Sequence, residues 1–420
     1  MESDNRPVII VGYTAGWKHV AQKHHRDTTT LFVDTPAAAR EKDLAAVLAA
    51  AGAPCELITT DYEAEGAAAR FHDEYEGRPP AAVIPGIEYA VPFAARLAEL
   101  FGLPGAGPLA ADRLRDKGLL REVTADSGVR NPVSRPVTHP DEVRKLMAET
   151  GGPVVLKPAN RQGSIGTRII RTAEDVAEAW TECTVREHRA MAAQSTVPVR
   201  MLAESFLSGP EFSVELLVRD GRALFGNVTA KSLFPGDRPV ELGHTVPADI
   251  PAELSERLRS ATEHLLGTVG FATGFVHCEW IVVDGEPHLV ECAGRMPGDG
   301  IITLIDLAWG IDITREYLAV MRGDAPRADL PDRAAGGAAS WFVSAEPGEV
   351  IRVGGTSAAT RLPGVVSADV LAGPGSVTRA LRSGRDRVGS VVATGSDAAE
   401  ARRRAQDAAA SIEVVVRPRT

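Results

Sequence analysis

The sequence has few cysteines and few aromatic side chains. Its 420 residues include four cysteines, which are scattered along the chain and form no CxxC pair: Cys55, Cys183, Cys278 and Cys292. Because this spacing is no disulfide framework, we expect reduced, mostly buried thiols in a cytoplasmic protein. Aromatic residues make up 5% of the chain while alanine is abundant, so we expect helices built largely on Ala and Leu.

The sequence also lacks a long apolar run and a long basic run. No stretch approaches the ~20 apolar residues that a membrane-spanning helix needs, and residues 1–7 are polar, unlike a signal peptide. The formal net charge of −10 argues against a nucleic-acid or anionic-membrane surface, although a small anionic ligand can still bind in a local basic pocket. We therefore expect no nucleic-acid partner and no membrane partner.

The length and the order of apolar runs predict several packed units that begin with an α/β domain. With 420 residues, 44% of them apolar, the chain is long enough for two to four units. Near the amino terminus, short apolar runs alternate with Ala-rich helical stretches, which is typical of a parallel α/β sheet. The expected strands are 8–12, 30–33, 55–59 and 82–85, and the expected helices are 37–51 and 64–75. We place this domain at residues 1–112.

The remaining chain predicts a more antiparallel architecture. Helices at 91–101 and about 112–126 end where Gly, Asn and Pro break the chain at 128–132. The elements expected next are a strand, a helix and two strands around a Gly-rich turn within 133–171; a helical stretch to about 194; consecutive antiparallel strands at 199–204, 211–218 and 223–231; a helix at 251–269; a hairpin at 274–283 and 288–293; a helix at 306–323; and a β-rich end from 334 with a helix at 397–410. We divide this part into domains at 113–330, with a subdomain at about 130–200, and at 331–420.

A lysine near the end of an apolar strand is followed at once by a Gly/Ser-rich turn. Lys157 is costly to bury unless an anion meets it, and the turn at 160–167 can direct several backbone N–H groups toward phosphate oxygens. The lysine precedes the glycines, so this is no Walker loop, in which it follows them. The motif indicates a phosphate site, and the alternative is a surface hairpin with an exposed lysine.

A second motif, residues 203–215, runs from a strand into a linker. Such a linker can offer backbone N–H and C=O groups to an adenine edge, with Phe206 and Leu207 as apolar walls. Glu211 follows Glu204 by seven residues and can accept hydrogen bonds from ribose hydroxyls. Taken alone, the motif slightly favours the other interpretation, in which both glutamates are solvated charges that flank a turn.

Two apolar strands flank the Asp-Gly turn at 284–285, and each carries one glutamate. If Val283 pairs with Pro287 across a three-residue loop, Glu279 lies directly opposite Glu291. Like charges in that position destabilise a sheet, so the pair calls for a cation between them. Carboxylate oxygens of this kind suit an Mg²⁺ that also binds phosphates.

The same strand parity places two more residues, His277 and Arg295, on this face of the hairpin. A tight two-residue turn at 284–285 would instead offset the two glutamates by one place. The alternative is a rim hairpin with solvated glutamates. That interpretation fits Glu286 well. It fits Glu291 poorly, because Glu291 lies between two apolar neighbours.

In their order along the chain, these residues resemble the ATP-grasp superfamily, and above all its L-amino acid ligase and biotin carboxylase branch, which includes peptide ligases of natural-product pathways. The resemblance covers roughly residues 8–325. The segments 85–89, 103–105 and 243–248 also resemble the amino acid ligases. The resemblance implies an ATP-grasp fold with an N-terminal parallel α/β (pre-ATP-grasp) domain, a mobile lid subdomain, an antiparallel-sheet catalytic core and a small C-terminal β-rich domain.

The resemblance also implies ATP and Mg²⁺, which Mn²⁺ can replace, as cofactors. The positions that match phosphate lysines, the lid loop, the adenine hinge and the ribose carboxylate are Lys117, Lys157, Gln162, Gly163, Ser164, Gly166, Glu204, Phe206, Leu207 and Glu211. Glu279 and Glu291 match the Mg²⁺ ligands. Many relatives carry asparagine two residues after the second glutamate, where this chain has Ala293. This departure leaves the metal geometry open, and with it a non-catalytic ATP-binding relative.

Four further residues match the catalytic end of the superfamily's site. Arg295 matches an arginine that holds the substrate carboxylate or its acyl-phosphate oxygens, and Lys231 matches, more loosely, another basic residue. His277 stands where the D-alanine–D-alanine ligases carry arginine. Either His277 or His244 is a candidate to orient the amine or accept its proton. A structural histidine is the alternative for each, with equal weight for His244.

The resemblance implies a ligase that uses ATP to activate a carboxylate as an acyl phosphate and then joins it to an amine, releasing ADP and phosphate. Such chemistry depends on positioning and charge stabilisation and needs no nucleophilic side chain. The expected partners are small-molecule carboxylate and amine substrates, with an amino acid among them, and specificity is expected at 12–17, Glu88 and 296–300. A homodimer is common among relatives. The alternatives are a bicarbonate-activating carboxylase-like enzyme and an inactive ATP-binding protein.

Overall fold

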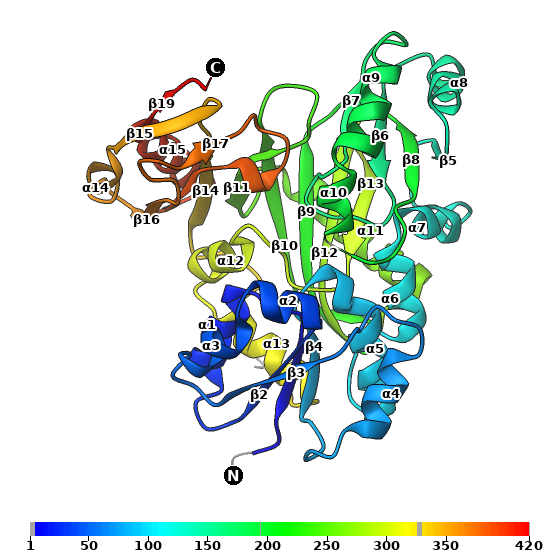
Figure 1. Ribbon diagram of the computed structural model, residues 1–420, viewed down its shortest axis with the longest axis vertical. Helices are drawn as coiled ribbons and strands as arrows, with labels where there is room; N and C mark the ends of the chain where they lie inside the picture. Colours follow the sequence, from blue (N-terminus) through cyan, green and yellow to red (C-terminus); the bar gives the residue numbers. More distant parts are fainter. Residues whose placement is uncertain (1–4, 194, 326–329, 420) are drawn as a thin grey trace.

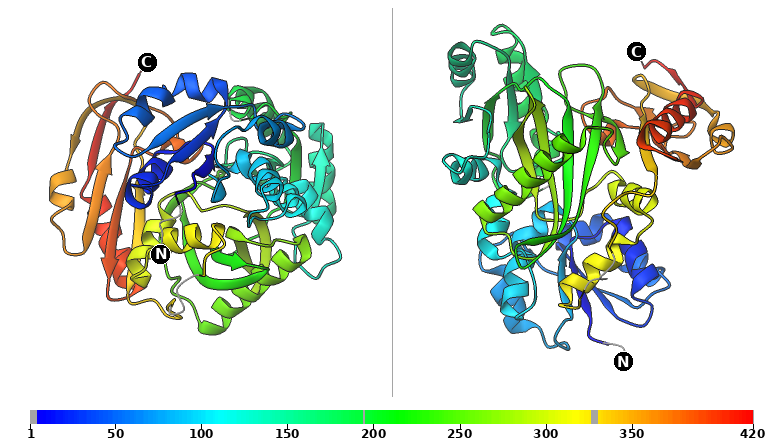
Figure 2. Two further views of the ribbon diagram at one scale, coloured as in Figure 1. Left: turned by 90° about the horizontal axis from the view of Figure 1, so that it is seen from below. Right: turned by 180° about the vertical axis from the view of Figure 1, so that it is seen from behind.

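Three regions of the protein meet around a central sheet in the computed structural model, which describes residues 5–193, 195–325 and 330–419 (Figure 1). The amino-terminal α/β region lies at one end of this sheet. At the other end, the strands around the lysine motif and the carboxy-terminal strands lie on opposite sides, as both views of Figure 2 show. The candidate site lies between these regions.

The amino-terminal region is a four-stranded parallel sheet with the order β3-β2-β1-β4. Its strands are β1 (Val8–Val11), β2 (Thr30–Asp34), β3 (Cys55–Thr59) and β4 (Ala82–Pro85), and its helices are α1 (Ala15–His24), α2 (Pro36–Glu41), α3 (Leu44–Ala49), α4 (Ala67–Glu74) and α5 (Val91–Leu100), with a 3-10 turn η1 (Glu88–Ala90) before α5. Ile9 packs in a core with Phe71 and Phe93, while Ile10 packs on the other face with Trp17 and Tyr317. Both faces are covered, which explains the continuous apolar runs in these strands.

A second four-stranded sheet, with the order β5-β8-β6-β7, carries the lysine motif and the Gly-rich turn. It consists of β5 (Ser134–Val137), β6 (Val154–Pro158), β7 (Arg168–Ile170) and β8 (Met201–Ser205), with α8 (Pro140–Thr150), α9 (Val176–Thr181), the π-helix η2 (Glu182–Arg186) and α10 (His188–Ala192) against it; residue 194, the expected end of this helical stretch, lies outside the described residues. The expectation that β8 continues into the next antiparallel strands was wrong, because β8 pairs with β5 and β6. The linker 206–210 carries the chain across to the central sheet.

The central sheet has eight strands in the order β13-β12-β9-β10-β11-β14-β18-β16, and its neighbours pair antiparallel. The strands are β9 (Glu211–Arg219), β10 (Arg222–Leu233), β11 (Glu241–Val246), β12 (Gly274–Val283), β13 (Glu286–Ala293), β14 (Gly337–Val343), β16 (Val365–Val370) and β18 (Gly389–Gly395). Val214 and Leu216 of β9 pack in one core with Leu265 of α11 (Ala252–Val269). That core also takes in α6 (Pro108–Arg115) and α7 (Lys117–Thr124). The alternating residues of β9, such as Glu215, therefore face the other side.

The remaining elements lie outside the central sheet, and the three strands among them form a sheet of their own. They are α12 (Ile301–Trp309), α13 (Ile313–Met321), β15 (Gly348–Gly354), α14 (Thr356–Ala359), β17 (Val377–Thr378), the 3-10 turn η3 (Gly384–Asp386), α15 (Ala398–Ala410) and β19 (Glu413–Arg417). The single helix expected at 306–323 is two helices, because Gly310 ends α12 with φ of +66° and Asp312 caps α13. The helix expected at 37–51 is also divided, at Asp43, whose φ is +47°.

Within the described residues, no helix is long and apolar enough to cross a membrane.

Candidate active site

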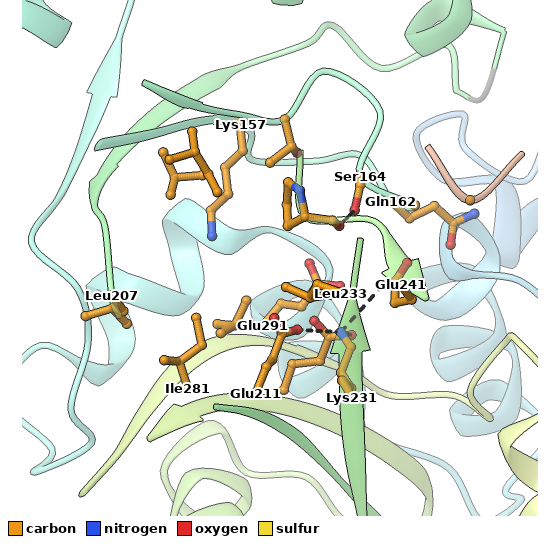
Figure 3. Close-up of a pocket in the computed structure, with 18 of the residues that line it drawn as sticks. Lys157, Gln162, Ser164, Leu207, Glu211, Lys231, Leu233, Glu241, Ile281 and Glu291 are labelled. Carbon is orange, nitrogen blue, oxygen red and sulfur yellow. Dashed lines mark hydrogen bonds and ion pairs between the residues drawn. The ribbon is translucent and has the colours of Figure 1, made fainter. Parts of the chain in front are cut away.

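A cavity of about 660 Å³ lies between the lysine-motif sheet and the central sheet (Figure 3). We call it the nucleotide cavity. All of the predicted site residues line it except Gly166, namely Lys117, Lys157, Gln162, Gly163, Ser164, Glu204, Phe206, Leu207, Glu211, Lys231, His244, His277, Glu279, Glu291 and Arg295. Residues from three motifs far apart in the sequence thus share one cavity.

Lys157 lies buried in β6, at the top of the pocket in Figure 3. Its Nζ lies 2.6 Å from Glu204 Oε2, and Arg121 Nε donates to Glu204 Oε1 at 3.0 Å. Burial acts to raise the pKa of Glu204, but Arg121 and Lys157 overcome it and lower the pKa to about 2. Glu204, which was predicted to belong to the adenine hinge, is therefore ion-paired with two cations of the protein itself. The sequence analysis did not single out Arg121.

The Gly-rich turn after Lys157 adopts left-handed backbone conformations. Gly163, Ser164 and Gly166 have φ of +72°, +58° and +74°. Ser164 Oγ donates to the carbonyl of Pro239 at 2.8 Å, and the Gly166 N–H donates to Glu187 Oε2 at 2.5 Å. Gly166 therefore faces the protein, whereas Gly163 and Ser164 line the cavity and can present backbone N–H groups to an anion.

The linker between β8 and β9 closes one end of the nucleotide cavity. The Phe206 N–H donates to the Pro153 carbonyl at 3.0 Å, and both Phe206 and Leu207 line the cavity. Gly209 lies so close to the Val282 carbonyl that a Cβ there would overlap the oxygen. These contacts fix the linker beside the central sheet, where its apolar side chains can cover a flat ring.

The β12–β13 hairpin turns on two residues, which is the tight turn that the sequence left open beside a three-residue loop. Val283 pairs with Glu286, so the alternative Val283–Pro287 pair does not form. Asp284 and Gly285 have φ of +51° and +78°. A positive φ at both central positions is the geometry that favours an Asp-Gly turn in a tight hairpin.

Glu279 nevertheless lies directly opposite Glu291, as predicted, because a β-bulge compensates for the shorter turn. Trp280 pairs with Leu289, which leaves Val290 as the extra residue of β13. The bulge restores the strand parity that the tight turn would have shifted. Both glutamates consequently line the nucleotide cavity.

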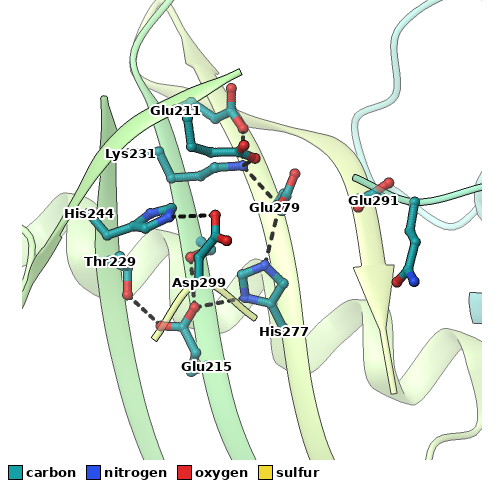
Figure 4. Close-up of polar contacts among 12 residues, drawn as sticks. Glu211, Glu215, Thr229, Lys231, His244, His277, Glu279, Glu291 and Asp299 are labelled. Carbon is teal, nitrogen blue, oxygen red and sulfur yellow. Dashed lines mark hydrogen bonds and ion pairs between the residues drawn. The ribbon is translucent and has the colours of Figure 1, made fainter. Parts of the chain in front are cut away.

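Each of these glutamates has a lysine beside it. Lys231 Nζ lies 2.9 Å from Glu279 Oε1 and 2.5 Å from Glu211 Oε1 (Figure 4). Lys117 Nζ lies 2.7 Å from Glu291 Oε2. Burial acts to lower the pKa of Lys231, but Glu211 and Glu279 raise it well above its usual value. Lys231 therefore stays charged and partly neutralises this acidic face of the central sheet.

His277 is held between two carboxylates. Its Nδ1 lies 2.9 Å from Glu215 Oε1 and its Nε2 lies 3.2 Å from Glu279 Oε1. Burial acts to lower the pKa of His277, but its hydrogen bonds to Glu215 and Glu279 raise it to about 9. Glu215 also accepts hydrogen bonds from Ser213, Asn227 and Thr229. The sequence analysis missed Glu215, although it shares strand parity with Glu211.

A second cavity, also of about 660 Å³, adjoins the nucleotide cavity. We call it the substrate cavity. Residues of the three segments expected to set specificity, 12–17, Glu88 and 296–300, line it. Inside it, Arg295 Nε donates to Glu88 Oε2 at 2.7 Å, and Arg295 Nη2 donates to Gln162 Oε1 at 3.3 Å. Arg295 and Gln162 line both cavities, so they mark the passage between them.

Asp299 also lines both cavities, and the sequence analysis missed its role. Arg387, which follows η3, donates to Asp299 from Nη2 at 2.5 Å and from Nη1 at 2.9 Å. His244 Nε2 lies 3.3 Å from Asp299 Oδ2 (Figure 4). Burial acts to raise the pKa of Asp299, but His244 and Arg387 hold it well below its usual range.

Two family models match the chain. Residues 150–303 match an ATP-grasp domain, and residues 340–417 match the L-amino acid ligase C-terminal domain 2. The first range contains most of the nucleotide cavity, and the second contains Arg387.

Relatives and solved structures agree with these models. The chain is 28% identical over 321 residues to the uncharacterized protein y4rH of Sinorhizobium fredii, covering 76% of this chain and 64% of that protein. It is 28% identical over 254 residues to the alanine–anticapsin ligase of Bacillus subtilis, covering 57% of this chain and 53% of that protein. The chain thus spans less than two thirds of the length of these curated relatives.

The structure of the L-amino acid ligase from Bacillus licheniformis superposes with a TM-score of 0.75 at 18% identity, over 98% of this chain and 99% of that one. At this identity the likeness shows the fold, which is the ATP-grasp fold expected from the sequence. The chain therefore contains an ATP-grasp domain and the C-terminal domain 2 of the L-amino acid ligases.

Proposed function

We propose that the protein is an ATP-dependent carboxylate–amine ligase that forms an amide bond between an amino acid and an amine. The observation that carries this proposal is the passage at Arg295. A cavity with buried lysines and an opposed glutamate pair meets a second cavity there, and the Glu88–Arg295 pair lies in that second cavity. Glu88 and Arg295 present one negative and one positive group, which matches the two charges of an amino acid.

ATP binds in the nucleotide cavity in this proposal. Lys117 and Lys157 neutralise phosphate oxygens, the Gly163–Ser164 turn closes over them, and the linker at 206–210 covers the adenine. The Lys157 and Lys117 side chains are only 8% and 14% exposed, which favours this arrangement, because a charge is stabilised more strongly by an anion in a cavity shielded from water.

Glu279 and Glu291 would hold Mg²⁺ in this proposal. Within the described residues, no group of three or more His, Cys, Asp or Glu side chains is arranged to hold a metal ion by itself. Two carboxylates suit an Mg²⁺ that completes its octahedron with phosphate oxygens and water, so the absence of the usual asparagine at Ala293 is compatible with binding. When bound, the ion would neutralise phosphate charge during phosphoryl transfer.

The reaction proceeds in two displacements. A substrate carboxylate oxygen, oriented by Arg295, attacks the γ-phosphorus, the bond to the β-phosphate oxygen breaks, and ADP leaves with the electron pair. The amine nitrogen then attacks the acyl carbon, and the carbon–oxygen bond to phosphate breaks. An ammonium substrate gives up two protons in total, one that leaves with hydrogen phosphate and one that is released to solvent. The protein contributes positioning and charge stabilisation in both steps.

We assign His277 a positioning role instead of the proton transfer considered from the sequence. Both of its ring nitrogens face carboxylates, and its pKa is raised to about 9. An imidazolium ring in that setting orients Glu279 and is poorly suited to accept a proton from the amine. His244, beside Asp299, is assigned a similar role.

The proposal is tested by incubating the protein with ATP, Mg²⁺ and pairs of amino acids, and by measuring ADP, phosphate and amide products. We expect ADP and phosphate in equal amounts together with a dipeptide or another amide. Phosphate release with bicarbonate alone would favour the carboxylase-like alternative. ATP binding without ADP formation for any carboxylate would favour an inactive ATP-binding protein.

A further inference from the structure

Asp299 lies in the passage between the two cavities and is held there by another part of the chain. It lies in the loop between β13 and α12, and its φ of +53° is a left-handed conformation that aspartate adopts more readily than most residues. Arg387, 88 positions further along the chain, donates two hydrogen bonds to the Asp299 carboxylate.

Two further contacts hold the Arg387 side chain in place. Its guanidinium group lies 3.6 Å from the ring centroid of Phe342, and its Nε donates to the Gly384 carbonyl at 2.8 Å. A stacked guanidinium with a bidentate grip on a carboxylate has little freedom left to lose. The C-terminal region thereby places one carboxylate at a defined point of the passage.

The Asp299 carboxylate still has a free side. Its oxygens offer about four acceptor positions. In the described part of the chain, Arg387 takes one on each oxygen and His244 lies beside Oδ2. The Asp299 side chain is 29% exposed, whereas Arg387 is 11% and His244 is 2% exposed. The open side of the carboxylate therefore faces the cavities that it lines.

We propose that Asp299 binds the ammonium group of the amine substrate and holds it beside the acyl phosphate. This inference rests on the proposed function and extends it by naming the subsite of the second substrate and its chemistry, a primary amine that arrives as a cation. Glu88 already faces Arg295 within the substrate cavity, so Asp299 supplies a second anionic contact at the passage.

Asp299 acts in this proposal as a binding group and not as a base. Arg387 and His244 stabilise its ionised form, so it accepts hydrogen bonds well but takes up a proton poorly. The same carboxylate also raises the local concentration of cationic amines over neutral nucleophiles such as water. Asp299 would in this way favour amide formation over hydrolysis of the acyl phosphate.

The test compares a cationic acceptor with a neutral one in the variant Asp299→Asn. Hydroxylamine is largely uncharged at neutral pH and converts an acyl phosphate to a hydroxamate without needing an ammonium site. We expect the KM for an amino acid acceptor to rise about 10-fold or more. We expect hydroxamate formation from the same carboxylate to change by less than about twofold, because its activation by ATP does not involve Asp299.

Each outcome of this experiment decides something. Equal losses with both acceptors, or no loss with either, would overturn the role of Asp299. If the wild-type protein forms neither ADP nor hydroxamate with any carboxylate, the proposed function fails and the inference fails with it. Asp299→Glu, which keeps the charge, is the second variant should Asp299→Asn not fold, and it should show the same selectivity in a weaker form. Asp112→Asn is the matched control, because it breaks another bidentate Arg–Asp pair, with Arg96, outside both cavities.

Discussion

The nucleotide cavity and the substrate cavity are built in different ways. The charged side chains of the nucleotide cavity sit mainly on strands of two sheets and pair with one another across short distances, as Lys231 does with Glu211 and Glu279. The substrate cavity is lined mainly by loops and helix ends. It contains a carboxylate, Asp306, whose charge is only weakly stabilised by its neighbours. The difference separates a strand-borne part suited to ATP-dependent transfer from a loop-borne part suited to selecting substrates.

The largest expected effect tests whether the strand-borne part is indispensable. Glu279→Gln and Glu291→Gln should each lower ADP formation by about 1,000-fold or more, because a neutral amide is a poor ligand for the cation that balances the phosphates. The measurement is ADP formation at saturating ATP and substrate, with ATP binding followed separately by calorimetry.

Glu286→Gln on the same hairpin is the control for this prediction. Glu286 lies outside both cavities and pairs with Arg130 at 3.0 Å at the partly exposed tip. Its substitution should leave the rate within about twofold, since exposed ion pairs contribute little. Full activity of either cavity variant would contradict the assignment of the glutamate pair.

The next largest effect concerns stability and tests whether the pairing in the nucleotide cavity is structural as well. Glu204→Gln leaves Lys157 and Arg121 buried with a neutral partner, so we expect a loss of about 3 kcal/mol in the free energy of unfolding. Chemical denaturation at neutral pH measures it. Glu413→Gln, which breaks an exposed pair with Arg352, should change the stability by less than about 0.5 kcal/mol.

The same network predicts how wild-type stability depends on pH. The folded-state pKa of Glu204, about 2, lies below the ordinary value of 4.5. Its contribution is therefore fully present above pH 4.5 and is lost as the pH falls toward 2. Glu204→Gln should flatten this part of the stability profile, and an unchanged profile would show that the network contributes little.

The two cavities also differ in how much of them the sequence predicts. Strand parity placed Glu279 and Glu291 on one face, because a strand fixes which side chains share a face. The resemblance to the ATP-grasp superfamily added Lys157 to the same site. The turn has two residues, the length that would by itself have offset the glutamates, and their pairing depends on the bulge at Val290. An extra residue in an apolar strand has no signature in the sequence, so the register could not be derived from the residues alone.

No local sequence pattern indicated the contacts between distant segments of the chain. Arg121 reaches Glu204 across 83 positions, and Arg387 reaches Asp299 across 88. Neither arginine lies in a motif, and the partner of each is decided by how the regions dock. The sequence indicated the segments that line the substrate cavity, but it did not indicate that Asp299 faces an arginine from the C-terminal region.

A smaller, more selective effect is expected in the substrate cavity. Glu88→Gln removes the negative charge beside Arg295, so the KM for the amino acid that supplies the carboxylate should rise about 10- to 100-fold, in line with the loss of a charged hydrogen bond. The affinity for ATP should stay within about twofold. Glu99→Gln, on the exposed face of α5, is the control, and an equal loss of ATP affinity in Glu88→Gln would erase the distinction between the cavities.

The smallest expected effect is a gain in stability and not a loss, and it concerns Asp306 of the substrate cavity. Burial raises the pKa of Asp306 from 3.8 to about 6. The hydrogen bond that Asp306 accepts from the Ile313 N–H at 2.9 Å lowers the pKa and only partly offsets the effect of burial. Because the folded-state pKa lies above the unfolded one, this group destabilises the fold above pH 6, and the penalty disappears as the pH falls toward 3.8. Asp306→Asn keeps an acceptor for Ile313 and should raise the free energy of unfolding by about 1 kcal/mol above pH 6, after allowance for solvent screening, with no gain below pH 3.8. Denaturant titrations at several pH values measure the difference, and Asp126→Asn on the exposed surface should show none. A gain that is the same at every pH would mean that packing, and not an uncompensated charge, distinguishes this cavity from the paired glutamates of the other.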